Sequence, residues 1–204
     1  AIALLDPALA RNEATKALDD PATFLKRSAS PRRAMQELRL LALMRLAVND
    51  HEAASQKLAN EGLTATQSAW AWAYVGRQAA FKLAPEASGY YQHALSQFKG
   101  GANGEAARHP GWSDDTLAWG VRAALRSRED SRWWLVQHLI EAMSPAAQKD
   151  PAWVYWRAQA LAATAKPGAE GDAQRAESRQ LLDSLTGDPH YHGLLAHEAL
   201  GRPA

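Results

Sequence analysis

The residues best suited to recognise a ligand lie together in one short stretch, DPAWVYWRAQAL, which covers residues 150–161. Two tryptophans, a tyrosine and an arginine fall within the five positions 153–157. Aromatic rings of this kind either stack on the faces of sugars or fill the space between packed helices, and an arginine either binds an anion or lies over a ring. The stretch therefore predicts a saccharide-binding surface or the interior of a helix pair.

The local pattern of this stretch favours packing, with ligand binding as the alternative. The Asp-Pro pair at its start is typical of a helix beginning, because the aspartate can cap free amides and proline suits the first helical position. One side of such a helix carries Trp153, Trp156, Arg157, Ala160 and Leu161. Arg157 follows Trp153 by one turn, and we expect its guanidinium to lie over that ring. Tyr155 points elsewhere, together with Ala158 and Ala162, toward a neighbouring helix pair.

Two further aromatic groups raise the same choice between packing and binding. Trp133 and Trp134 are adjacent in RWWLV (132–136), and adjacent helical residues cannot both face one interface. One of these two rings is therefore expected at the edge of a helix hairpin, where it could contact a ligand in a groove. Together with Tyr155, they are the candidate groove contacts. In WAWAY (70–74), the spacing divides the rings between two faces of a helix.

The residues that could hold a metal or carry out catalysis do not form a recognisable site. His190 and His192 have the spacing of a strand, and His197 is turned well away from His192 on a helix. The acidic pairs Asp114–Asp115 and Glu129–Asp130 are interpreted as helix caps and turn residues. Neither pair lies in an apolar pocket that would raise the pKa of a carboxyl group. The glycine-rich and nucleophile motifs of phosphate-binding proteins and hydrolases are missing. We predict no catalytic residue, no cofactor and no metal in this chain.

Composition narrows the classes of partner further. The 204 residues include 23 basic and 22 acidic side chains, so the formal charge is +1 and gives no reason to expect nucleic acid or an anionic membrane. There is no cysteine, which excludes disulfides and thiolate chemistry. No apolar run reaches the roughly 18 residues of a membrane span. Because the chain opens at Ala1 without methionine or a leader, we expect a processed protein or an excised fragment.

The elements that must position these side chains are predicted to be helices throughout. Alanine, leucine, glutamine, glutamate and arginine dominate, strand patterns are nearly absent, and six of the ten prolines follow Asp or Ser at helix starts. The longest loops are expected at 99–111 and 165–172. The predicted helices lie near 7–18, 21–28, 31–48, 51–60, 64–82, 85–98, 113–127, 131–142, 151–165, 171–185 and 189–200.

The helices also repeat, which predicts their arrangement. LAWGVRAAL (117–125) aligns with WVYWRAQAL (153–161) at an offset of 36 residues, and their partner helices HLIEAM (138–143) and QLLDSL (180–185) correspond as well. A period of this length with aromatic and alanine-rich first helices indicates tetratricopeptide-like hairpins. We therefore predict an all-α fold, in which residues 1–204 form one α-superhelical domain, or solenoid, of antiparallel hairpins.

Three of these segments resemble the soluble lytic murein transglycosylases of Gram-negative bacteria, at the end of that family's N-terminal superhelical domain. They are GWSDDTLAWGVRAALR to RWWLVQHLIEAM (111–143), DPAWVYWRAQALAA (150–163) and HYHGLLAHEALG (190–201). The resemblance covers about the last 90 residues, and the first 100 are compatible with preceding hairpins. The insert AKPGAEGDAQRAES (165–178) is longer than the family's hairpin loop is expected to be.

The resemblance implies a periplasmic protein that cleaves the bond between N-acetylmuramic acid and N-acetylglucosamine in peptidoglycan, leaving a 1,6-anhydro end. In the family, one glutamate of a separate lysozyme-like C-terminal domain acts first as acid and then as base. That glutamate has no counterpart here, so the chain is expected to be a non-catalytic scaffold and peptidoglycan-access surface. Its partners would be peptidoglycan and its own catalytic domain. The alternative is a free-standing tetratricopeptide-like adaptor that binds a peptide or protein.

Overall fold

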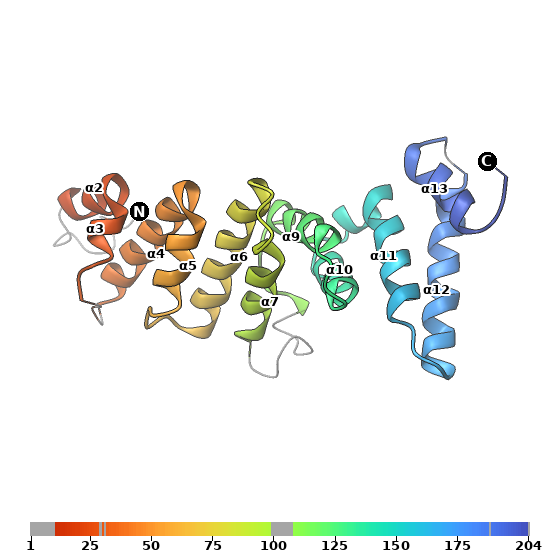
Figure 1. Ribbon diagram of the computed structural model, residues 1–204, viewed down its shortest axis with the longest axis horizontal. Coiled ribbons are helices and arrows are strands. Elements are labelled where there is room, and N and C mark those ends of the chain that lie inside the picture. The colour runs from red at the N-terminus through yellow and green to blue at the C-terminus, as the bar shows by residue number, and fades with distance from the viewer. Residues whose placement is uncertain (1–10, 29, 31, 99–107, 188, 204) are drawn as a thin grey trace. The chain divides into compact units, whose positions relative to one another are not determined.

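The computed structural model describes residues 11–28, 30, 32–98, 108–187 and 189–203, and in these residues every regular element is a helix (Figure 1). The chain divides into two compact units, residues 1–110 and residues 111–204. Among the described residues, no helix is both long and apolar enough to cross a lipid bilayer. The all-α prediction is therefore confirmed, whereas the single superhelical domain over 1–204 stays a prediction.

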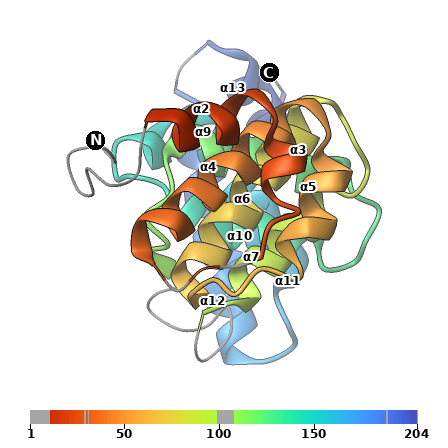
Figure 2. The same ribbon diagram turned by 90° about the vertical axis from the view of Figure 1, so that its left-hand side faces the viewer.

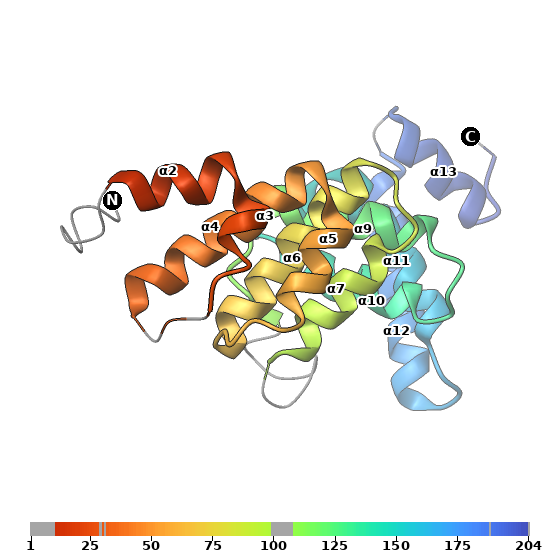
Figure 3. The ribbon, with the colours of Figure 1, turned by 60° about the vertical axis from the view of Figure 1, so that its left-hand side comes forward.

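Unit 1 (residues 1–110) consists of helix hairpins packed in sequence order. Its helices are α2 (Arg11–Asp19), α3 (Pro21–Phe24), α4 (Arg33–Asn49), α5 (His51–Leu58), α6 (Ala65–Phe81) and α7 (Ala87–Ser96). The pairs α4–α5 and α6–α7 form hairpins, and α6 also packs on both α4 and α5 (Figure 3). The short α3 and the preceding α2 pack on α4, in front of it in Figure 2.

Local signals fix where the helices of unit 1 begin. The carboxylate of Asp50 accepts a hydrogen bond from the Ala53 amide at 2.8 Å and caps α5. Thr64 and Gln67 form a capping box at the start of α6, which satisfies two amides reciprocally. The hairpin of α6 and α7 closes tightly at Gly76, where an added Cβ would lie 3.0 Å from the fully buried ring of Tyr91.

One ion pair is buried inside unit 1. Arg39 of α4 and Glu61 of the loop after α5 both have side chains 7% exposed, and they form a bidentate pair. The Arg39 guanidinium also donates to the backbone carbonyls of Arg27 at 2.8 Å and Leu25 at 3.2 Å. A single side chain therefore joins three segments that are distant in the sequence.

Unit 2 (residues 111–204) follows the same plan. Its elements are α9 (Asp114–Arg126), α10 (Arg132–Glu141), the short 3-10 helix η2 (Ala147–Lys149), α11 (Pro151–Thr164), α12 (Ala169–Leu185) and α13 (Tyr191–Ala199). The hairpins α9–α10 and α11–α12 pack together through α10 and α11, and α13 packs on α11 and α12. The buried residues Ala158, Leu182, Leu185 and Ala196 form a core between these last three helices.

The predicted helices are confirmed in order and number wherever the structure describes them, with shifts at particular ends. The last one begins at Tyr191 rather than at 189, because the ring of His190 accepts a hydrogen bond from the Gly193 amide at 2.8 Å and is the cap. The predicted loop at 165–172 is shorter, because α12 already begins at Ala169. The sequence pattern did not predict η2, and the predictions for residues 7–10 and 99–107 lie outside the described residues.

Gly168 and Gly171 explain the short loop between α11 and α12. Gly168 has a φ of +109°, a conformation that other residues rarely adopt. At Gly171, an added Cβ would lie only 1.7 Å from the carbonyl oxygen of Lys166. The chain can therefore turn into α12 within four residues only because both positions lack a side chain.

Candidate functional site

The rings of Trp133 and Trp134 are both half-buried on α10, and each is engaged by a side chain of its own helix. The Arg132 guanidinium lies 5.1 Å from the centre of the Trp133 ring. The Trp134 ring lies 4.1 Å from the ring of His138, whose Nδ1 is 2.9 Å from the Trp134 carbonyl oxygen. The two rings diverge as expected for adjacent helical residues, and a groove contact by one of them stays a prediction.

The Tyr155 side chain points toward the neighbouring helix pair, as the helix periodicity predicts. Its ring packs against the α11–α12–α13 core and lies 5.9 Å from the ring of His192 on α13. Burial raises the pKa of the Tyr155 hydroxyl, and the negative charge of Glu198 raises it further. The direction predicted for Tyr155 is confirmed, and its role as a groove contact stays a prediction.

Arg157 does not lie over Trp153, in contrast to the expectation from their spacing. Its guanidinium pairs with the carboxylate of Glu177 on α12 at 2.6 Å and approaches Glu141 on α10 at 3.9 Å. Two carboxylates attract a guanidinium more strongly than one ring, so Arg157 turns toward them. The cation over Trp153 is Arg122 of α9, at 5.3 Å from the ring centre.

Arg122 also lies 5.0 Å from the centre of the Trp119 ring, so that one guanidinium contacts a tryptophan from each of two helices. We call Trp119, Arg122 and Trp153 the aromatic–cation cluster. Its two rings are half-buried and Arg122 is exposed. Within the part of unit 2 that the structure describes, Arg122 has no acidic partner. The cluster thus offers ring surface beside a cation whose N–H groups remain available to an acceptor.

The elements that hold the aromatic–cation cluster follow from the sequence around it. Ser113 caps α9 through a hydrogen bond from the Thr116 amide at 3.3 Å, and Leu117 and Val121 are fully buried on the opposite side of the helix. That anchoring turns Trp119 and Arg122, one turn apart, to the same outer side. Asp150 caps α11 through the Ala152 amide at 2.8 Å, which places Trp153 in the first turn.

Unit 1 carries a second aromatic surface on the first helix of a hairpin. Trp72 of α6 is 7% exposed and packs against the rings of Tyr90 and His93 on α7. Trp70 and Tyr74 stack on another side of α6 with ring centres 6.1 Å apart, and Trp70 is 39% exposed. The predicted division of these rings between two faces is confirmed.

Among the histidines and carboxylates singled out in the sequence, His190, His197 and Asp114 serve as caps or links. His190 caps α13, and the Nε2 atom of His197 is 3.3 Å from the Thr186 carbonyl oxygen. Asp114 accepts hydrogen bonds from the amide and hydroxyl of Ser144, at 2.8 and 2.7 Å. In the described ranges, no group of three or more histidine, cysteine or acidic residues could hold a metal ion.

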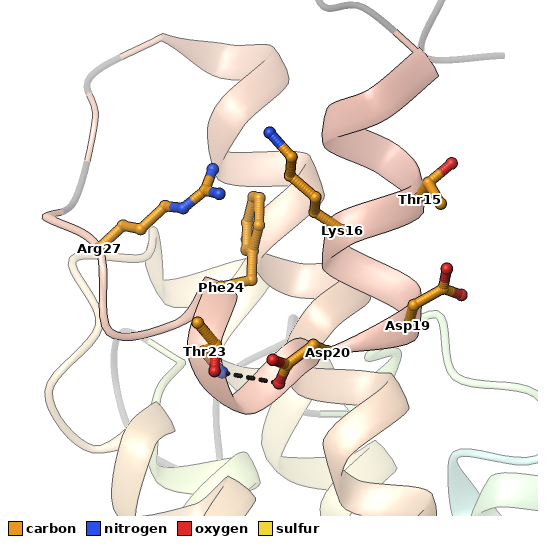
Figure 4. A pocket seen from close by; sticks show the side chains of 7 residues that line it. All are labelled: Thr15, Lys16, Asp19, Asp20, Thr23, Phe24 and Arg27. Carbon is orange, nitrogen blue, oxygen red and sulfur yellow. Dashed lines mark hydrogen bonds between the residues drawn. The ribbon is translucent and has the colours of Figure 1, made fainter.

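Two of the hollows in the described structure are lined by charged residues. The first, of about 220 Å³, lies beside α2 and α3 (Figure 4) and is lined by Thr15, Lys16, Asp19, Asp20, Thr23, Phe24 and Arg27. Lys16 and Arg27 both pair with Glu13, at 3.0 and 2.5 Å, and Asp19 and Asp20 add two further negative charges, so the positive charges of this hollow are compensated. The second hollow, of about 420 Å³, lies between α11, α12 and α13.

The fold resembles one solved structure along nearly its whole length. An inactive mutant of the lytic transglycosylase Slt from Pseudomonas aeruginosa matches 99% of this chain with a TM-score of 0.62 and 21% identity. The match covers 31% of that protein, so this chain spans less than a third of its length. No family model and no curated protein matches the chain. The chain therefore has an all-helical fold like that of a helical region of a lytic transglycosylase.

Proposed function

We propose that this chain is a non-catalytic helical region of a periplasmic lytic transglycosylase, which cleaves the bond between N-acetylmuramic acid and N-acetylglucosamine in peptidoglycan. Its role is that of a scaffold and a surface over which peptidoglycan reaches the catalytic domain. The observation that carries this proposal is the fold likeness to the transglycosylase Slt over 99% of the chain. The three sequence segments that resemble the same family support it independently.

The aromatic–cation cluster provides a physical means of contact with peptidoglycan. The faces of pyranose rings carry C–H groups that stack on the π faces of tryptophan, while the stem peptides carry carboxylates that suit a guanidinium. Trp119 and Trp153 offer ring surface, and Arg122 lies between them without a competing acid among the described residues. The formal charge of +1 suits a polymer made largely of neutral sugars.

Three carboxyl groups of the chain have a pKa shifted away from the value that a general acid needs. A general acid in glycan cleavage requires a carboxyl pKa raised toward neutrality. Hydrogen bonds lower the pKa of Glu13 through Lys16 and Arg27, of Asp20 through Thr23, and of Asp114 through Ser144. Each of these three shifts is opposite to the one that a general acid needs.

The adaptor function is the second candidate, and one observation favours it. On α13, Tyr191 is 68% exposed and Leu194 is 54% exposed, one turn apart on the same side of the helix. Exposed apolar residues at this spacing suit contact with another protein. A free-standing adaptor would bind a peptide or protein partner and show no affinity for purified peptidoglycan.

The test is cosedimentation of the purified 204-residue chain with peptidoglycan sacculi that have been freed of bound protein. We expect the chain to sediment with the sacculi, and the double variant Trp119→Ala/Trp153→Ala to bind at least about fivefold more weakly, since each ring contributes roughly 0.5–1.5 kcal/mol. Tyr191→Ala is the matched control, because it removes an exposed ring of the same unit outside the cluster. Equal binding by the double variant would remove the cluster from the proposal, and no binding by the wild-type chain would favour the adaptor.

The same sacculi test the absence of catalysis. After incubation with the chain, mass spectrometry of the supernatant should detect no 1,6-anhydro muropeptides above a buffer control. Release of such products, if abolished by a single Glu→Gln substitution in this chain, would contradict a non-catalytic role.

A further inference from the structure

The second hollow differs from the first in carrying an uncompensated charge. It is lined by Gln159, Ala162, Arg175, Ser178, Arg179, Leu182, Ala199 and Leu200, which come from α11, α12 and the end of α13. Its volume of about 420 Å³ lies within the usual range of small-ligand sites. All three helices belong to unit 2 and share the core of Ala158, Leu182, Leu185 and Ala196. The hollow is thus a feature of one compact unit.

Two arginines, one turn apart on α12, contribute positive charge to this hollow, and they differ in their partners. Arg175 donates to the Asp172 carboxylate at 2.5 Å and to the carbonyl oxygens of Ala165 and Lys166 at 3.5 and 3.4 Å. The Arg175 guanidinium is therefore held by the loop before α12 and by the start of α12. It contributes charge to the hollow, but few of its N–H groups are left for a ligand.

Arg179 has neither an ion pair nor a hydrogen bond to any of the described residues. The acid best placed to pair with it along the helix is Asp183, four residues later, but Asp183 is held by Arg202 at 2.5 Å. The five N–H donors of Arg179 are consequently free at the edge of the hollow. An anion with planar, bidentate geometry is the ligand that best matches such a guanidinium.

The apolar residues that line the hollow have small side chains. Ala162, Leu182, Ala199 and Leu200 supply methyl and isobutyl groups and no aromatic ring. Gln159 adds one side-chain amide to the lining. The hollow therefore combines a mainly polar lining, which includes a free cation and an amide, with a few small apolar side chains. Together they suit a carboxylate that carries a small alkyl group.

We propose that this hollow binds the C-terminal alanine of a short peptide. The carboxylate of the peptide pairs with Arg179, and its methyl group contacts Leu182 and Leu200. The source of the peptide rests on the proposed function, because the stem peptides of peptidoglycan end in D-alanine. The hollow is separate from the aromatic–cation cluster, whose residues do not line it. The two sites would hold the peptide and the glycan parts of one polymer.

The test is titration of the full 204-residue chain, labelled with nitrogen-15, with N-acetyl-D-alanyl-D-alanine and with the C-terminal amide of the same dipeptide. We expect the acid to shift the amide resonances of α11, α12 and α13, and the neutral amide to bind at least about tenfold more weakly, because a charge-assisted pair is lost. Arg179→Met should weaken binding of the acid to the level of the amide. Arg128→Met is the matched control, since Arg128 is an exposed arginine of the same unit outside the hollow.

Several outcomes would overturn the inference. Equal binding of the acid and the amide would remove the role of the carboxylate, and an unchanged affinity in Arg179→Met would remove the role of Arg179. Arg179→Glu gives a second variant in which the charge is reversed, and it should abolish binding while circular dichroism shows intact helices. Equal affinity for N-acetyl-L-alanyl-L-alanine would contradict peptidoglycan as the source of the peptide.

The dipeptide titration and the sacculus assay test the role of the hollow and the proposed function independently. Sedimentation with sacculi without any binding of the dipeptide would overturn the role of the hollow and leave the proposed function intact. Binding of the D-dipeptide through Arg179 without sedimentation would sustain the hollow as an alanine-carboxylate site and count against the proposed function.

Discussion

The buried pair of Arg39 and Glu61 should be the most sensitive point of unit 1. Replacing Arg39 by methionine keeps most of the side-chain volume but removes the charge and four hydrogen bonds. Two of these bonds go to the Glu61 carboxylate, one to the Arg27 carbonyl and one to the Leu25 carbonyl. The variant thereby leaves a carboxylate that is only 7% exposed without its counterion.

The expected cost follows from these contacts. Removing one partner of a buried ion pair costs about 3–5 kcal/mol, because the remaining charge is desolvated and uncompensated. The apolar stem of methionine recovers part of this loss, so we expect Arg39→Met to lower the free energy of unfolding by about 3 kcal/mol. The double variant Arg39→Met/Glu61→Leu should cost less than Arg39→Met alone, since it leaves no buried charge behind.

The measurement is urea unfolding followed by helix circular dichroism, with hydrogen exchange of the α4 amides to assign the transition to unit 1. Arg33→Met is the control. Arg33 pairs with Glu37 on the same helix but is 87% exposed, and its loss should change stability by less than about 0.5 kcal/mol. A cost for Arg39→Met no larger than that of Arg33→Met would refute the reasoning. A double variant that costs the sum of its two single changes would refute it as well.

Three further outcomes follow from the geometry of single residues. Gly171→Ala should lower the melting temperature, because its Cβ would lie 1.7 Å from the Lys166 carbonyl oxygen. Gly89→Ala, at an exposed position of α7, meets nothing within 4 Å and should stabilise the protein by about 0.5–1 kcal/mol. Asp114→Ala should be less stable than the wild type at neutral pH. Because the pKa of Asp114 is lowered in the folded state, its contribution to stability is complete above the ordinary pKa of 3.8 and is lost as the pH falls through the lower folded pKa. The stability difference between the wild type and Asp114→Ala should therefore shrink in acid denaturation curves below about pH 3.8. In an absorbance titration, Tyr155 should ionise above the ordinary pKa of 10.0, and this ionisation should be missing in Tyr155→Phe. The contribution of Tyr155 to stability should be complete below pH 10 and be lost as the pH rises through the folded pKa.

Most of the helices could be predicted from the sequence because their signals are local. Asp20 and Asp150 each precede a proline and each accept a hydrogen bond from an amide two or three residues later, as their helix starts require. The start of α13 was misplaced because its cap is His190, whose ring nitrogen replaces the usual carboxylate or hydroxyl. The short loop before α12 depends on how closely Gly171 approaches Lys166, which no sequence pattern expresses.

The site was less predictable because its contacts join distant residues. The direction of Tyr155 followed from the helix period alone, since residues 155 and 158 share a side of α11. The partner of Arg157 did not follow, because Glu141 and Glu177 lie 16 and 20 residues away and come into reach only when three helices pack. The contact of Arg122 with Trp153 could not be predicted for the same reason. The contact of Arg122 with Trp119, one turn earlier on the same helix, can be read from their spacing in the sequence.

The spacing of an aromatic residue and an arginine three positions later is the same in both units, yet the chemistry differs. Arg27 lies 4.9 Å from the ring centre of Phe24, and Arg122 lies 5.0 Å from that of Trp119. The two distances are thus nearly equal, although Arg27 lies just after the end of α3 and Arg122 lies inside α9. Phe24, however, is 1% exposed, and Arg27 is neutralised by Glu13 from the preceding helix. Arg122 instead meets a second tryptophan and no acid among the described residues of unit 2. The local pattern predicts a cation over a ring in both cases, and the neighbouring helix decides whether that cation stabilises the fold or remains available to a ligand.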